Sequence, residues 1–81
     1  LELAENNYNI RVNCINPGFT KTSYFQNFKK NKKLYKWTLS KISAGRWGES
    51  SEISKLAIFL LSNKASYING QIINIDGGWK Y

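Results

Sequence analysis

Two short segments with the pattern of β-strands, one near each end of the chain, constrain the fold most strongly. Residues 10–15 alternate apolar and polar side chains and stop before Pro17 and Gly18, which predicts a strand ended by a turn. Residues 71–76 are rich in isoleucine and stop before a double glycine. This second pattern predicts a strand buried on both faces, as in a parallel sheet.

A helix is predicted between the two strands. Residues 49–52 (ESSE) carry a capping-box signature, with Glu52 in the first turn. Apolar side chains then recur at the spacing of one helix face, at Ile53, Leu56, Ala57, Leu60 and Leu61. We expect this helix to end near residues 62–63, and residues 1–6 to form the last turns of an earlier helix. The order helix, strand, long segment, helix, strand predicts an α/β fold.

The long segment between the first strand and this helix, residues 19–48, is polar and aromatic. We expect a loop with one or two short helices, and a loop of this length usually serves as a lid or a binding loop. No acidic residue lies between Asn6 and Gly48, whereas nine basic residues do. The lysine cluster at residues 29–41 has three interpretations: a nucleic-acid patch, attraction of an acidic substrate or acidic carrier protein, and the solvated face of a helix. We prefer the third, because the apolar residues Phe28, Tyr35, Leu39 and Ile42 follow an amphipathic spacing.

Composition excludes several classes of protein. One Cys and no His among 81 residues exclude a disulfide framework, a Cys/His zinc site and any His-based nucleophilic mechanism within this chain. We expect Cys14 to be a small buried strand residue. The longest apolar run, residues 56–61, is too short to span a membrane, and no signal peptide is visible. We expect a cytoplasmic protein, and the chain, which lacks an initiator Met, to be the C-terminal piece of a longer one.

Three ordered blocks of sequence carry a family resemblance. They are residues 10–22 (IRVNCINPGFTKT), residues 45–53 (GRWGESSEI) and residues 59–78, which end in IDGG. Together they resemble the short-chain dehydrogenase/reductase family in both pattern and order. Ser50 and Ser51 depart from the Pro-Glu that is usual in the second block.

The resemblance implies a fold and an activity. It implies an NAD(P)-dependent oxidoreductase that interconverts a carbonyl and an alcohol by hydride transfer, of sugar-acid or 3-oxoacyl-carrier-protein type. Residues 1–81 would be the C-terminal portion of one Rossmann-type, doubly wound parallel sheet domain: its last two strands, the helix between them and the substrate lid at about residues 23–44.

The resemblance also implies site residues. Four residues after the first strand would bind the nicotinamide end of NAD or NADP: Pro17, Gly18, Thr20 and Thr22. Four residues of the lid would face a small carbonyl or alcohol substrate or anchor the lid: Tyr24, Phe25, Phe28 and Trp37. The choice between NAD and NADP stays open, because the residue that reads the ribose lies upstream.

No residue of this chain is expected to be catalytic. No Tyr is followed four positions later by Lys, and no Gly has a second Gly four positions later, so the family's Tyr-x-x-x-Lys pair and Gly-rich loop are absent from the sequence. No metal ligand is predicted. The chain alone is therefore expected to be inactive. The alternative is a non-catalytic basic binding module, or an inactive relic of the family.

Further expectations concern partners and single residues. The resemblance implies a homo-oligomer, a dimer or tetramer formed through the last helix and strand, with no membrane and no nucleic-acid partner. Asn13 should bond backbone near the first strand, and Asp76 should hold the turn that follows it. Arg46 has two open roles, a carboxylate pair or a subunit contact. Trp79 and Tyr81 would pack either on a neighbouring subunit or within the same one.

Overall fold

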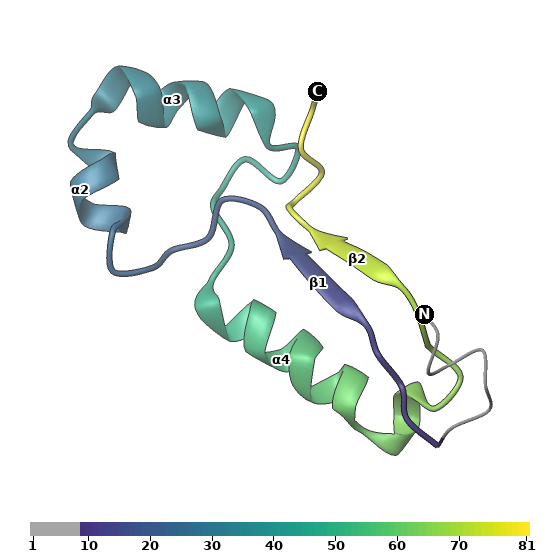
Figure 1. The fold of residues 1–81 in the computed structure, drawn as a ribbon. Helices are drawn as coiled ribbons and strands as arrows, with labels where there is room; N and C mark the ends of the chain where they lie inside the picture. The colour runs from purple at the N-terminus through teal and green to yellow at the C-terminus, as the bar shows by residue number, and fades with distance from the viewer. Residues whose placement is uncertain (1–8) are drawn as a thin grey trace.

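The computed structural model describes residues 9–81, so the helix end expected at residues 1–6 lies outside the described residues. In chain order the elements are β1 (Cys14–Pro17), α2 (Phe25–Lys29), α3 (Lys32–Lys41), α4 (Ser50–Leu61), the 3-10 turn η1 (Asn63–Ala65) and β2 (Ile72–Ile75). β1 and β2 lie side by side and parallel, and the chain passes from one to the other through the helices (Figure 1). The α/β arrangement with a helix between two parallel strands is confirmed.

The two strands pair over four residues each. The register joins Cys14 to Ile72 and Pro17 to Ile75. The N–H groups of Cys14 and Gly18 donate to carbonyls of the β2 side, at 2.8 and 3.0 Å. Along β1, every second N–H points toward β2, and Gly18 has one of these. Pro17 lies at the alternate position, where an N–H would point to the edge of β1 away from β2, so the missing N–H breaks no bond to β2. This is why a proline can close the strand.

The first strand begins and ends later than predicted, at 14–17 instead of 10–15. The preceding residues are held beside the β2 side partly by asparagine side chains. Val12 N–H donates to Asn69 Oδ1 at 3.0 Å, and Asn13 accepts from Gln71 N–H and donates to the Ile68 carbonyl, both at 3.0 Å. The structural role predicted for Asn13 is confirmed, and these amides take the place of a regular ladder.

Helix α4 has the predicted start and end. Glu49 is the N-cap, and the reciprocal bonds of a capping box are present: the side chain of Glu49 accepts from the backbone of Glu52, and the side chain of Glu52 accepts from Glu49 N–H at 2.9 Å. Leu60 is buried, and Ile53, Leu56 and Ala57 are partly buried. The predicted stripe also includes Leu61, which is 84% exposed at the last turn, so that part of the prediction is wrong.

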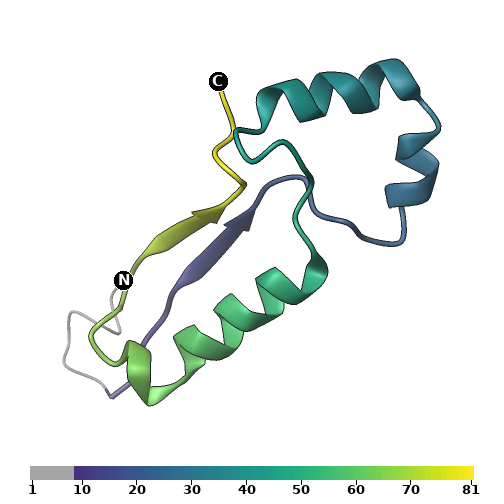
Figure 2. The ribbon, with the colours of Figure 1, turned by 180° about the vertical axis from the view of Figure 1, so that it is seen from behind.

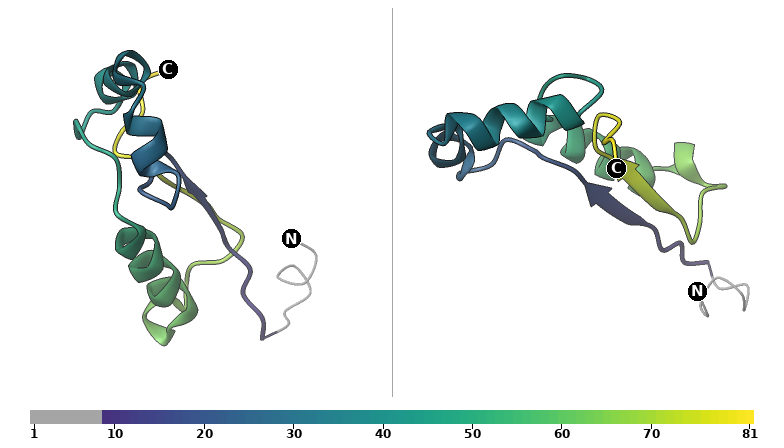
Figure 3. Two further views of the ribbon diagram at one scale, coloured as in Figure 1. Left: turned by 90° about the vertical axis from the view of Figure 1, so that its left-hand side faces the viewer. Right: turned by 90° about the horizontal axis from the view of Figure 1, so that it is seen from above.

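Helix α4 covers one face of the two-stranded sheet, and the other face carries no layer among residues 9–81 (Figure 3). Strand alternation places Ile15, Ile73 and Ile75 toward α4 and Ile72 on the open face, where it is 72% exposed. The expectation of a second strand buried on both faces is therefore wrong for this chain. Cys14 is exposed for the same reason, not buried as predicted.

The main apolar cluster lies in and around residues 23–44, the segment predicted to be the lid and called the lid below, away from the sheet. Phe25, Ile42 and Trp47 form its buried centre, and five partly buried residues pack against it: Phe19, Phe28, Tyr35, Leu39 and Trp79. The amphipathic spacing of the lysine-rich region thus points its apolar side into this cluster, and Lys29, Lys30, Lys32, Lys33 and Lys36 are exposed. The two short helices are confirmed (Figure 2). The exposed lysines fit the preferred solvated face, and they would be equally exposed in either of the other two interpretations.

The molecule is open in shape. Its radius of gyration is 15.9 Å, whereas a compact domain of this length has about 12 Å. Among the described residues no helix is long and apolar enough to cross a membrane.

Candidate functional site

Both strands end at the same edge of the sheet, and the lid lies beyond that edge (Figure 1). An open depression of about 350 Å³ lies there, lined by Asn16, Pro17, Gly18, Phe19, Asp76, Trp79 and Tyr81. The carboxyl ends of parallel strands are where open α/β sheets bind ligands. The structure thus brings Pro17 and Gly18, two of the four predicted cofactor residues, into this depression.

Gly18 is required by the close approach of the two strand ends. A Cβ added to Gly18 would lie 2.6 Å from Asp76 Cβ and 2.8 Å from Asp76 Cα. The close packing of the two strand ends therefore requires glycine at position 18, and the sequence alone does not show this contact. The backbone of Gly18 also stays paired, because its N–H donates to the Ile75 carbonyl at 3.0 Å.

Thr20 and Thr22 do not line the depression. Thr20 pairs with Gly48 in an isolated parallel bridge, and its hydroxyl donates to the Gly18 carbonyl at 3.0 Å. Thr22 opens the lid: its hydroxyl accepts from Tyr24 N–H at 3.4 Å and its carbonyl accepts from Phe25 N–H at 3.0 Å. Both threonines hold the chain that leads from the strand end into α2.

The four predicted lid residues separate into two pairs. Phe25 is buried, and Phe28 packs with it against Trp47, with ring centroids 5.1 and 5.0 Å from the indole. Tyr24 is 76% exposed, and Trp37 is half-exposed. The first pair anchors the lid, while the second pair has free surface for contact with another molecule.

The centre of the lid is a buried polar contact inside the aromatic cluster. Trp47 Nε1 donates to Thr38 Oγ1 at 2.9 Å, and the Thr38 hydroxyl donates to the Tyr35 carbonyl at 2.6 Å. Thr38 is completely buried, so these bonds satisfy a group that would otherwise be costly. No role was predicted for Trp47 or Thr38 from the sequence. The one signal for this contact in the sequence is a tryptophan, Trp47, between Arg46 and Gly48, since a buried indole N–H needs an acceptor.

Two ion pairs hold the base of the lid against the start of α4. Lys21 lies 2.9 Å from Glu49, and Arg46 lies 2.8 Å from Glu52. The hydrogen bond from Arg46, together with Glu49 N–H, lowers the pKa of Glu52 to about 2, and Glu52 in turn raises the pKa of Arg46. Of the two roles predicted for Arg46, the carboxylate pair is the one observed.

Asp76 holds the turn after β2, as predicted. Its Oδ1 accepts from Gly78 N–H at 3.0 Å. Trp79 packs within the same chain, with its ring centroid 5.4 Å from that of Phe19, whereas Tyr81 is 99% exposed.

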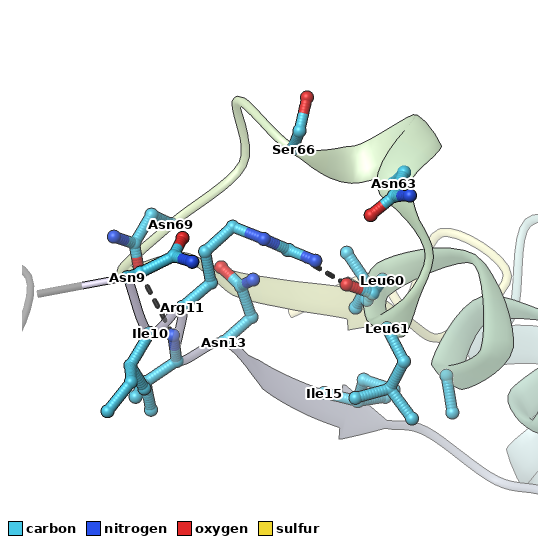
Figure 4. Close-up of a pocket in the computed structure, with 12 residues that line it drawn as sticks. Asn9, Ile10, Arg11, Asn13, Ile15, Leu60, Leu61, Asn63, Ser66 and Asn69 are labelled. Atoms are coloured by element: carbon cyan, nitrogen blue, oxygen red, sulfur yellow. Dashed lines mark hydrogen bonds between the residues drawn. The ribbon is translucent and has the colours of Figure 1, made fainter.

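A larger depression, of about 980 Å³, lies at the opposite end of the sheet and has a structural explanation (Figure 4). Arg11 extends across it and donates to the carbonyls of Leu60, Ser62 and Ile68, at 2.8, 3.2 and 3.2 Å. The guanidinium thereby satisfies the last carbonyls of α4. Arg11 was quoted in the family pattern but given no role; a guanidinium inside a strand-like segment is the signal that it needs acceptors.

The depression at the strand ends suits a planar ring better than a phosphate. None of its seven lining residues is basic, and three of them, Phe19, Trp79 and Tyr81, are aromatic. These lining residues fit the nicotinamide end of a dinucleotide. Because none of them is basic, they would not hold its diphosphate.

Comparison with known proteins identifies the family. The family model described as enoyl-(acyl carrier protein) reductase matches residues 1–80. A 2-dehydro-3-deoxy-D-gluconate 5-dehydrogenase of Bacillus subtilis is 40% identical, over 86% of this chain and 28% of its own length. A 3-oxoacyl-[acyl-carrier-protein] reductase of Chlamydia muridarum is 47% identical, over 86% of this chain and 27% of its own length.

Solved structures agree in fold. An Agrobacterium tumefaciens protein provisionally assigned as a 2-deoxy-D-gluconate 3-dehydrogenase, with bound NADP, gives a TM-score of 0.87 at 41% identity. It is matched over 96% of this chain and 31% of its own. A 4-hydroxyisoleucine dehydrogenase complexed with NADH gives 0.85 at 36% identity, over 96% and 31%. The chain thus spans less than a third of the relatives it matches, and it belongs to the short-chain dehydrogenase/reductase family.

Proposed function

We propose that this chain is the C-terminal part of an NAD(P)-dependent oxidoreductase that interconverts a carbonyl and an alcohol. The single observation that carries the proposal is the depression at the strand ends, with Pro17 and Gly18 in its wall and an aromatic lid beyond it. The cofactors NADP and NADH in the related structures support the choice of cofactor.

The loop after β1 holds the nicotinamide end of the cofactor. Pro17 and Gly18 form the wall, while Thr20 and Thr22 fix the course of the loop through bonds to neighbouring backbone. The main-chain polar groups of this loop orient the carboxamide, and so determine which face of the ring meets the substrate. When bound, the cofactor supplies or accepts the hydride.

Residues 23–44 form the substrate lid. Phe25 and Phe28 anchor it through the cluster around Trp47, and Tyr24 and Trp37 supply exposed aromatic surface for the substrate. A packed lid excludes water from the reacting atoms when it closes. The substrate is a small carbonyl or alcohol compound, and the relatives favour a sugar acid or a 3-oxoacyl thioester.

Proton transfer must come from outside this chain, because the sequence contains no Tyr-x-x-x-Lys pair and no Gly-rich dinucleotide loop. The isolated chain is accordingly inactive. The complete enzyme is a cytoplasmic homo-oligomer joined through α4 and β2. Exposed Ile58 and Leu61 on α4 support that subunit contact, and a single exposed thiol agrees with a reducing compartment.

The test is to express the complete gene product and measure two quantities: binding of NADH and NADPH, and turnover of 2-dehydro-3-deoxygluconate and 3-oxoacyl thioesters. We expect binding of at least one dinucleotide and turnover of one substrate class by the complete protein, with neither in residues 1–81 alone. A gene product without an upstream Tyr-x-x-x-Lys pair, or one that binds neither dinucleotide, would contradict the proposal. It would favour the basic binding module or the inactive relic.

A further inference from the structure

Trp79 stands where three separate segments meet. Its ring centroid lies 5.4 Å from that of Phe19, in the loop after β1, and 5.8 Å from that of Trp37, in α3, at an interplanar angle of 72°. Its backbone pairs with Ile42, at the exit of the lid, in an isolated antiparallel bridge. One indole therefore contacts the lid and the loop that forms the wall of the depression.

Backbone bonds hold the tail that carries Trp79, independently of the indole. Ala44 N–H donates to the Gly77 carbonyl at 2.9 Å, Ser43 N–H to the Gly78 carbonyl at 3.1 Å, and Lys80 N–H to the Lys41 carbonyl at 2.7 Å. Replacing the side chain of Trp79 leaves these donors and acceptors in place. The effect of such a replacement should therefore be confined to the contacts of the side chain: the two aromatic pairs, its packing against the buried cluster and its part in the wall of the depression.

The double glycine before Trp79 makes this approach possible. Gly77 and Gly78 have φ angles of 63° and 79°, in the left-handed region that favours glycine. A Cβ on Gly77 would lie 2.8 Å from Ile42 Cγ2. The turn after β2 thus brings the tail tightly against the lid exit and directs the indole to its position.

We propose that Trp79 is a positioning residue that couples the lid to the cofactor loop, so that α3 and the loop after β1 are ordered together. Phe19 directly follows Gly18 and lines the depression beside Trp79, so the indole acts on the wall both directly and through Phe19. Loss of the indole frees both segments at once. The link to catalysis rests on the function proposed above, whereas the coupling of the two segments does not.

Hydrogen exchange of the complete protein tests the coupling. In Trp79→Ala, amides of residues 18–21 and of residues 32–41 should exchange faster together, by about tenfold, because two aromatic pairs are lost. Trp79→Phe should restore most of the protection in both segments. Tyr67→Ala, a fully exposed tyrosine beyond η1, is the matched control and should change neither segment.

The functional consequence is measured on the same variants as the Kd of NADH and NADPH. We expect Trp79→Ala to weaken binding of the preferred dinucleotide by about tenfold and Trp79→Phe to restore most of it. The unfolding midpoint should fall by only a few degrees, so that the variant stays folded at the temperature of the measurement. Faster exchange in the lid alone, or in neither segment, would overturn the coupling. If the wild-type protein binds neither dinucleotide, the proposed function fails, while the exchange data still decide the coupling.

Should Trp79→Ala fail to fold, Trp37→Ala is the second variant. It removes the contact between Trp79 and α3 and leaves the contact between Trp79 and Phe19 in place. The proposal then predicts faster exchange at residues 18–21 as well as in α3, because the indole of Trp79 loses its support on the lid side. Unchanged exchange at residues 18–21 would contradict it.

Discussion

At the scale of single residues, the tightest constraint at the strand ends is the contact between Gly18 and Asp76. A side chain at position 18 would have to displace the backbone of the neighbouring strand end, since the nearest atoms are Asp76 Cβ and Cα, at 2.6 and 2.8 Å. Backbone cannot give way as a flexible side chain can. The site and the sheet therefore depend on the same glycine.

We predict that Gly18→Ala destabilises the complete protein by about 1–3 kcal/mol, the usual cost of overpacking, and weakens dinucleotide binding. Urea unfolding measures the first effect and titration with NADH or NADPH the second. Gly48→Ala is the matched control: its added Cβ would have no neighbour closer than Thr20 Oγ1 at 3.7 Å, so it should be nearly neutral. Equal stability of the two variants would show that the strand ends separate more easily than the structure indicates.

Glu52 provides a second residue-scale prediction, on pH. Its folded pKa of about 2 lies below the ordinary value of 4.5, so its stabilising contribution is present above pH 4.5 and is lost as the pH falls toward 2. In the complete protein, we expect the Glu52→Gln variant to have a lower thermal unfolding midpoint than wild type near pH 6. The difference between the two midpoints should shrink as the pH is lowered. A difference that stays constant down to pH 2.5 would mean that the carboxylate charge contributes nothing.

At the scale of elements, patterns that depend on neighbours in sequence were predictable. Helix α4 follows from its capping box and its apolar spacing, and the two lid helices follow from the amphipathic pattern around the lysines. Residues 10–13 were predicted as strand because their alternation is that of a strand. Whether they join a ladder depends on Asn69 and Gln71, far along the chain, which no local pattern reveals.

The site was predictable in part, for a similar reason. Pro17 and Gly18 follow from the turn signal and the family pattern, and the structure places both in the depression. The burial of Thr38 beneath Trp47 and the meeting of Trp79 with Phe19 depend on three-dimensional packing, so the sequence alone could not reveal them. The exposure of Cys14 and Ile72 was missed because a β-branched pattern reports the strand and not the layers that cover it.

At the scale of the whole molecule, the apolar surface is too large for an independent domain. Several large apolar side chains are mostly exposed, including Ile58 at 68%, Leu61 at 84% and Ile72 at 72%. The other edge of β1 pairs with no strand within residues 9–81. An uncovered edge and an uncovered face both favour association with other chains.

We therefore predict that the isolated 81-residue chain is molten or aggregates, and shows no sharp thermal transition. Differential scanning calorimetry, together with dye binding to exposed apolar surface, measures this. A sharp, cooperative transition of a monomer would contradict it, and would show that the lid cluster and α4 suffice for folding.

A related prediction concerns assembly of the complete protein. Leu61→Asp should shift the oligomer toward smaller species, because it places a charge on the exposed apolar end of α4. Lys55→Glu, an exposed change on the same helix, serves as the control. Analytical ultracentrifugation measures both, and an unchanged oligomer for Leu61→Asp would place the subunit contact elsewhere.

The aromatic cluster also gives the lid an intrinsic fluorescence signal. All three tryptophans of the chain lie in or against it: Trp47 is buried at its centre, and Trp37 and Trp79 sit at its edge. Indole emission is sensitive to water, so the intrinsic fluorescence that this chain contributes arises entirely from the lid and its contacts. Opening of the lid should shift that emission to the red, and closure over a substrate should reverse the shift, with no label attached.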